Sequence, residues 1–203
     1  MLSPYRELLD SNLEYLITQI SDLLPICSLD ICVSNFPEGV NAKLGIGGAS
    51  YTESLLHIFL DANNPNLRSS IERELAAVLA HEMHHCARVA EIPLVETLGE
   101  KFVIEGLACQ FETEITGEEQ PSFIPLDLCL HWQDHFAESL QALNSTDFCE
   151  ETWFLGKNPD QKPKYIGYAI GFGVVGKYLR HANLSAAQAY AVPAEEILAV
   201  VNG

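Results

Sequence analysis

The sequence feature that most constrains the fold is a histidine-rich stretch near the middle of the chain, His81-Glu82-Met83-His84-His85. Residues four apart lie on one face of an α-helix, so the imidazoles of His81 and His85 can reach the same metal ion. Glu82 is rotated by about 100° from His81, which lets its carboxylate address a water on that metal without binding the metal itself. The stretch is the HExxH pattern of zinc hydrolases, and it requires a helix at this point of the chain.

A helix is predicted here independently of the histidines. Ser69 and Glu72 have the spacing of a capping box, and the helix that they open runs to about Val89, before Pro93. A helix surface that is merely rich in histidine is the alternative interpretation of the same residues.

The HExxH pattern leaves the third metal ligand open. The metzincin continuation needs glycine at position 88 and histidine at position 91, where this chain has Arg88 and Glu91, so that class is excluded. Thr97 and Glu100 repeat the capping-box spacing and open a second predicted helix that runs to about Thr116.

Glu105, within this second helix, is the favoured third ligand. Nineteen residues separate it from His85, which leaves room for one turn to bring the second helix back across the first. Glu105 interrupts a largely apolar stripe, where an unpaired charge is costly and a metal ion removes the cost. Gly106 allows the two helices to approach closely. Glu112 and Glu91 are the alternative ligands.

The remaining pattern predicts an α+β fold, a small and mostly antiparallel sheet followed by a helical region, in a single domain over residues 1–203. Apolar spacing and turn residues predict a helix over 5–24, strands over 29–34, 44–52 and 55–63, and helices over 126–143 and 165–181. The last of these helices contains four glycines, each of which costs about 1 kcal/mol relative to alanine, so close packing or a functional need must offset them.

The charge balance restricts the possible partners. Eleven Lys and Arg residues against 28 Asp and Glu residues give a net charge of −17, which argues against binding to nucleic acid or to an anionic membrane. Neither a signal-peptide pattern nor an apolar stretch long enough to span a membrane is visible. We therefore expect a cytoplasmic protein whose six cysteines are reduced and buried.

The motifs resemble a known superfamily. HEMHH, followed after 19 residues by Glu105 in Glu-Gly-Leu-Ala, is similar to the arrangement of the gluzincins, the thermolysin-like zinc metallopeptidases. The wider pattern resembles a bacterial family of predicted zinc-dependent proteases catalogued as a domain of unknown function. The shared segments, which span roughly residues 44–180, are Gly-Ile-Gly-Gly (45–48), Ala-His-Glu-Met-His-His (80–85), Glu-Gly-Leu-Ala (105–108), Trp-Phe-Leu-Gly (153–156) and Tyr-Ile-Gly-Tyr-Ala-Ile-Gly (165–171).

The resemblance implies a compact peptidase-like fold, zinc as the cofactor, and a peptide or protein as the substrate. One position departs from the pattern. Many gluzincins have an aspartate four residues after the ligand glutamate, where it supports a zinc-binding histidine, and this chain has Cys109 there. Glu112 or a backbone carbonyl must therefore orient the imidazole instead.

A hydrolytic mechanism follows from these residues as a hypothesis. With zinc held by His81, His85 and Glu105, Glu82 accepts a proton from the attacking water and returns it to the leaving amine. Tyr168 is the favoured donor to the oxyanion. Tyr165 is the next choice, and one of the helical pair His131 and His135 could also serve.

Two further interpretations stay open at this point. Gly47 and Gly48 could leave a strand edge open for an extended peptide substrate, or they could simply be required by a tight hairpin. The chain could also be a zinc-containing binding or regulatory protein without turnover, or a hydrolase of a non-peptide amide. The intact Glu82 argues against a pure binding protein, which has no need of that carboxylate.

Overall fold

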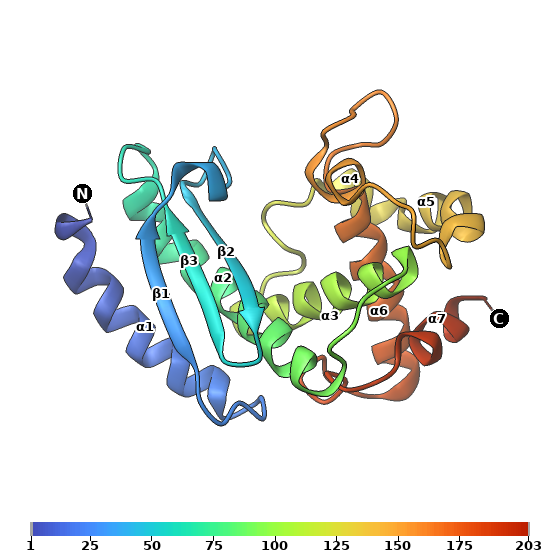
Figure 1. Ribbon diagram of the computed structural model, residues 1–203, viewed down its shortest axis with the longest axis horizontal. Coiled ribbons are helices and arrows are strands. Elements are labelled where there is room, and N and C mark those ends of the chain that lie inside the picture. The colour runs from blue at the N-terminus through green and yellow to red at the C-terminus, as the bar shows by residue number, and fades with distance from the viewer. Residues whose placement is uncertain (1, 203) are drawn as a thin grey trace. The chain divides into compact units, whose positions relative to one another are not determined.

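The computed structural model describes residues 2–202, and the chain packs as two compact units. The first unit ends at Glu91 and the second begins at Ile92, so the boundary lies directly after the helix that carries the histidines. The first unit contains the sheet and the second is helical, which confirms the α+β fold (Figure 1).

The first unit contains three strands and two long helices. In chain order its elements are η1 (Ser3–Tyr5), α1 (Arg6–Ser21), β1 (Asp30–Asn35), η2 (Pro37–Gly39), β2 (Ile46–Thr52), β3 (Leu55–Leu60) and α2 (Leu67–Glu91). All five long elements were predicted, with bounds that differ by a few residues.

The sheet is mixed, with the strand order β1-β3-β2. β2 and β3 are antiparallel because a tight turn joins them, whereas β1 pairs with β3 in parallel. The expectation of a mostly antiparallel sheet is therefore wrong for one of the two strand pairs. Residues 36–54, which separate β1 from β3, are long enough to bring the chain back in the same direction.

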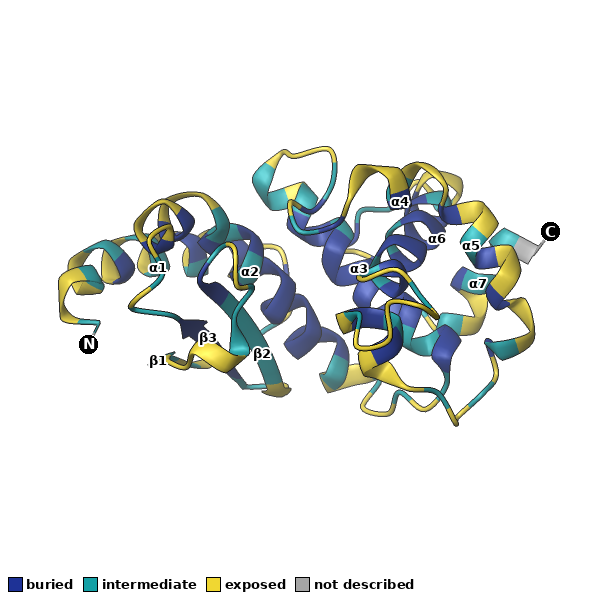
Figure 2. Ribbon diagram, turned by 90° about the horizontal axis from the view of Figure 1, so that it is seen from above, coloured by how far each residue is buried: buried dark blue, intermediate teal, exposed yellow. Residues whose placement is uncertain are grey.

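Both helices of the first unit lie on one face of this sheet (Figure 2). Alternate residues of β3, namely Leu56, Ile58 and Leu60, are fully buried. This alternation places one side of the central strand in the hydrophobic core. α2 packs against the edge strand β2, and this contact brings the histidine-bearing helix next to the glycines of that strand.

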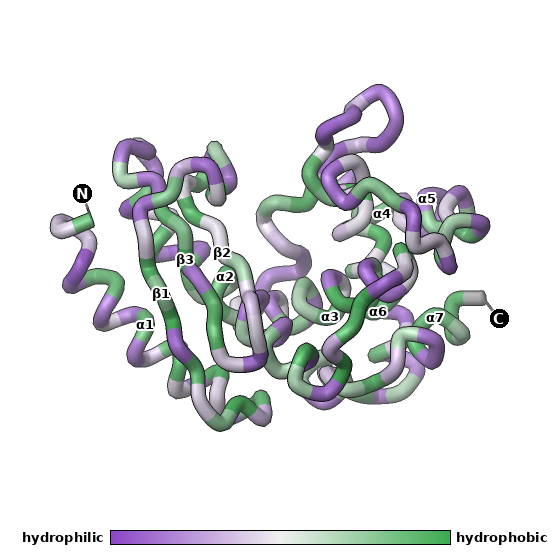
Figure 3. Tube along the Cα trace, in the orientation of Figure 1, coloured by the Kyte–Doolittle hydropathy of each residue, from purple (hydrophilic) through white to green (hydrophobic). Residues whose placement is uncertain are grey.

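The second unit is built around two helices, α3 (Leu98–Thr116) and α6 (Ile166–Ala182). The other elements are α4 (Leu126–Leu130), α5 (Trp132–Ser139), η3 (Leu140–Ala142), η4 (Glu151–Leu155) and α7 (Ala194–Asn202). The loop between η4 and α6 is mostly hydrophilic, whereas α6 itself is largely apolar (Figure 3). The predicted capping box of Thr97 and Glu100 is confirmed, and α3 ends at Gly117 in the left-handed conformation.

Two glycines allow the backbones of α3 and α6 to come into direct contact. A Cβ atom on Gly106 would lie 2.2 Å from the carbonyl oxygen of Gly171, and one on Gly171 would lie 2.2 Å from the carbonyl oxygen of Phe102. The close packing that the glycines of the predicted helix 165–181 required is therefore found here. Gly106 serves the contact with α6.

Three local predictions are wrong. The helix predicted over 126–143 is interrupted at His131, whose backbone φ of −109° separates α4 from α5. Ser69 does not cap α2, because the helix begins two residues earlier and the Ser69 hydroxyl donates to the carbonyl of Asn66. All six cysteines are free, but Cys27, Cys32 and Cys149 are exposed and only two of the six are buried.

Among residues 2–202, no helix has the length and the apolar character that crossing a membrane would require.

The contact between α3 and α6 can be tested with Gly171→Ala. The new methyl group would meet backbone atoms that cannot rotate away, so we expect a loss of about 2–3 kcal/mol in the free energy of unfolding, measured with urea. Gly176→Ala in the same helix is the matched control. Its methyl group meets the amide nitrogen of the flexible Gln110 side chain, which can rotate away at the cost of its hydrogen bond to the carbonyl of Phe172, so its stability should stay within about 1 kcal/mol of wild type. Equal losses in both variants would contradict the assignment.

Candidate metal centre

α2 presents two buried imidazoles on one face. The ring centroids of His81 and His85 lie 4.7 Å apart in an edge-to-face arrangement, and each residue is only 8% exposed. This follows from their spacing of one helical turn. Every residue of α2 from Leu79 to Arg88 is buried, which confirms that the HExxH stretch is not a histidine-rich surface.

Glu82 is held against the edge strand β2. A Cβ atom on Gly48 would lie 2.6 Å from Cγ of Glu82 and 3.0 Å from its carboxylate oxygen Oε1. Glycine at position 48 therefore leaves room for this buried side chain. Gly47 has a different neighbour, because its Cβ atom would lie 2.4 Å from the carbonyl oxygen of Gly39. Of the two glycines, Gly48 alone borders Glu82.

Glu105 is a buried carboxylate, 5% exposed, in the first half of α3. Its oxygen Oε1 lies 3.0 Å from the ammonium nitrogen of Lys101, one turn earlier in the helix. Burial lowers the pKa of Lys101, but the charges and hydrogen bonds of Glu105 and Glu150 outweigh that effect and raise the pKa above its usual range. Lys101 is therefore an ammonium ion at every physiological pH.

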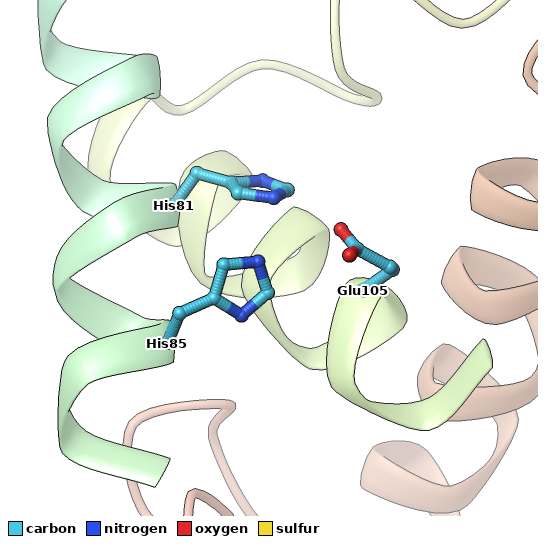
Figure 4. A group of neighbouring side chains, drawn as sticks. All are labelled: His81, His85 and Glu105. Carbon is cyan, nitrogen blue, oxygen red and sulfur yellow. The ribbon is translucent and has the colours of Figure 1, made fainter. Parts of the chain in front are cut away.

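The ligand atoms of His81, His85 and Glu105 all lie within 4.8 Å of one another. Figure 4 shows the two imidazoles and the carboxylate pointing toward one another. Two histidine nitrogens and one carboxylate oxygen are ligands that suit Zn²⁺, and a site with three protein ligands leaves a position for water or substrate. The donor set and its burial thus fit a catalytic zinc ion.

A second group shares one of these histidines. Ligand atoms of His81, Cys109 and Glu112 also lie within 4.8 Å of one another, and all three residues are buried. Cys109 stands where many gluzincins have aspartate, and Glu112 is the carboxylate that the sequence offered in its place. Their proximity favours Glu112 as the group that orients His81.

Tyr168 lies in an aromatic cluster of the second unit. Its ring centroid is 5.0 Å from that of Phe123, 5.1 Å from that of Phe154 and 6.2 Å from that of Tyr165. Tyr165, the N-cap residue of α6, has a left-handed backbone at φ 70°, a conformation that costs a non-glycine residue of the order of 1 kcal/mol or more. Its position just ahead of a helix gave no sign of this strain.

The other histidines lie in dissimilar environments. His84 is fully buried. His131 is largely exposed, and its Nε2 lies 3.5 Å from the carboxylate of Asp127. Neither His131 nor His135 belongs to a three-residue ligand group within the described residues.

Lys101 was not predicted from the sequence to lie at the site. Its spacing of four residues from Glu105 was the only available signal, and lysine at that spacing on a helix is common at protein surfaces. Its burial, which makes the pair unusual, could not be read from the sequence.

Comparison with known proteins identifies the family. The chain belongs to the family described as predicted Zn-dependent protease (DUF2268), whose pattern matches residues 11–199. The expected resemblance to such a bacterial family is thereby confirmed.

Two relatives from Bacillus subtilis (strain 168) are the uncharacterized proteins YjaZ and YjfC. YjaZ is 30% identical over 132 residues, which are 61% of this chain and 49% of YjaZ. YjfC is 24% identical over 180 residues, which are 80% of this chain and 57% of YjfC. The chain thus matches about half of the length of each relative. No solved structure matches, so the likeness to the gluzincins stays a prediction.

The metal centre can be tested by zinc titration of the purified protein. We expect one tightly bound Zn²⁺ per chain, and we expect His81→Ala and Glu105→Ala each to weaken binding by at least about 100-fold because each removes a ligand. His131→Ala with His135→Ala is the matched control, since this second pair has the same helical spacing. Loss of zinc binding in the control variant, with retention in the other two, would contradict the assignment.

Proposed function

We propose that this chain is a zinc-dependent peptidase in which His81, His85 and Glu105 bind the metal. The observation that carries the proposal is the buried group formed by their ligand atoms. A zinc ion bound there would lower the pKa of a water molecule to about 7 and polarise the carbonyl of the scissile bond. A single functional domain over residues 1–203 is part of the proposal.

Glu82 acts as the general base in this proposal. Its neighbour in sequence, His81, is a metal ligand, but Glu82 projects in another direction from α2 and toward Gly48. The carboxylate accepts a proton from the attacking water and delivers it to the nitrogen of the leaving amine. The narrow space beside β2 restricts the rotamers of Glu82, and this restriction supports a defined position for the proton acceptor.

Tyr168 donates a hydrogen bond to the oxyanion that forms at the attacked carbonyl. Three aromatic neighbours restrict the movement of the Tyr168 ring. This restriction supports the proposed role, because a donor that is already in position needs little reorganisation when the oxyanion forms. Tyr165, whose ring contacts the same Phe123, is the next choice. The exposed position of His131 makes it a weaker choice.

Peptides are the proposed substrates because β2 is an edge strand of the sheet, next to the proposed general base. An extended peptide could pair with the outer edge of this strand near Gly47 and Gly48. The net charge of −17 supports neutral or basic peptides as partners, and it disfavours nucleic acid and anionic membranes.

The reaction can be tested by incubating the zinc-loaded protein with a diverse peptide mixture and identifying new termini by mass spectrometry. Wild type should generate them, whereas Glu82→Gln should bind zinc with unchanged stoichiometry and cleave at least about 100-fold more slowly, because it lacks the proton acceptor. Zinc binding without any cleavage by wild type would favour the alternative, a binding or regulatory protein without turnover.

Gly48→Ala tests the position of Glu82. The methyl group would overlap Glu82 and the stiff side chain of Val78, so Glu82 must move. We expect kcat to fall by about 10–100-fold while zinc affinity is retained. Gly47→Ala is the comparison, because its methyl group meets the backbone of Gly39 and should lower stability more than it alters the chemistry. Unchanged kcat in folded Gly48→Ala would show that Glu82 needs no such space.

A further inference from the structure

Three charged side chains of the second unit form a chain of ion pairs that ends at Glu105. The ammonium nitrogen of Lys101 lies 3.0 Å from Oε1 of Glu105 and 2.6 Å from Oε1 of Glu150. Side-chain exposure is 7% for Glu105, 24% for Lys101 and 56% for Glu150, so the lysine links a buried carboxylate to one in contact with solvent.

The energetics of the helix do not account for a lysine at this position. Lys101 is the fourth residue of α3, where the positive end of the helix dipole disfavours a cation. A lysine that precedes its glutamate by four residues is also the weaker order for such a pair. Since apolar residues at both positions can often replace a buried ion pair without loss of stability, the fold by itself does not require the pair of Lys101 and Glu105.

The surroundings of Lys101 include the segment Trp153-Phe154-Leu155-Gly156, one of the segments that resemble the predicted protease family. The ammonium group lies 5.8 Å from the ring centroid of Phe154, a distance typical of a cation–π contact. Phe154 is buried, and its ring packs at 6.1 Å from that of Phe102 on α3.

Phe154 is itself fixed by α6. A Cβ atom on Gly167 would lie 2.5 Å from Cε1 of Phe154, so glycine at this position leaves room for the ring. The lysine is therefore confined by two carboxylates and by an aromatic ring that has little freedom to move.

We propose that Lys101 is a positioning residue for the metal ligand Glu105. By donating to Oε1, Lys101 orients the carboxylate and leaves the other oxygen as the one that binds the metal. Glu150 and Phe154 hold the ammonium group in place for this purpose. The inference rests on the proposed function, because it assumes that Glu105 is a zinc ligand.

Metal affinity, rather than activity, is the direct test. The affinities of wild type, Lys101→Met, Lys101→Arg and Glu150→Gln for Zn²⁺ would be measured by competition with a chromophoric chelator, and the visible absorption of the Co²⁺-loaded proteins would report ligand geometry. We expect Lys101→Met to lower Zn²⁺ affinity by about 10–100-fold and to alter the Co²⁺ spectrum. Lys101→Arg, which keeps a charged donor, should recover most of the affinity, and Glu150→Gln should show a smaller loss than Lys101→Met.

Lys177→Met is the matched control, because Lys177 is another half-buried lysine of the second unit and lines a separate pocket beside Trp132. It should leave zinc affinity unchanged. If wild type binds zinc tightly and Lys101→Met binds it equally well or more tightly, the positioning role is wrong while the proposed function stands. If wild type does not bind zinc, both are wrong. Should Lys101→Met fail to fold, unchanged affinity and an unchanged Co²⁺ spectrum in Glu150→Gln would overturn the inference.

Discussion

The burial of charged and polar groups at the candidate metal centre is the constraint on which the rest of this structure depends. Removing a carboxylate such as Glu105 from water is costly unless an opposite charge compensates for it. Lys101 supplies part of that compensation within α3 itself, and a zinc ion would supply the remainder in the proposed enzyme. The strong capping of α3 by Thr97 and Glu100 fixes the start of the helix that carries both groups. A stable helix end is thus one requirement for a defined ligand position.

The second requirement is space around the side chains of the proposed site, and glycines provide it. Gly171 lets α6 approach α3 at backbone distance, Gly167 makes room for the ring beside Lys101, and Gly48 makes room for Glu82. Each of these glycines gives up side-chain packing and chain stiffness, and each lies where a methyl group would collide with a neighbouring segment. The destabilising glycines of α6 therefore have a specific structural reason, since they determine how the side chains around the proposed site are held.

Much of the fold followed from short-range patterns. Apolar periodicity and capping residues predicted α1, α2, α3 and α6, because helix formation depends on neighbours three and four residues apart. The break at His131 escaped prediction because the apolar stripe continues across it. The parallel pairing of β1 with β3 escaped prediction as well, because strand order depends on contacts between residues far apart in sequence. Exposure of Cys27, Cys32 and Cys149 is likewise a property of the packed chain.

The candidate site, like the fold, could be predicted only in part from the sequence. The residues of the HExxH motif and the face that they share were set by local spacing, since the geometry of one helical turn is the same in every protein. Glu105 was favoured from its distance along the chain and its apolar surroundings, whereas the closeness of its ligand atoms to those of His81 and His85 could be seen only in three dimensions. Three other features arise only when distant segments pack together. They are the contact of Glu82 with Gly48, the strained backbone of Tyr165 and the confinement of Lys101. The sequence by itself thus determined which chemical groups are present and which of them share a helix face. The tertiary structure decided which groups are buried and which contact one another, because desolvation and steric exclusion depend on neighbours that lie far apart in the sequence.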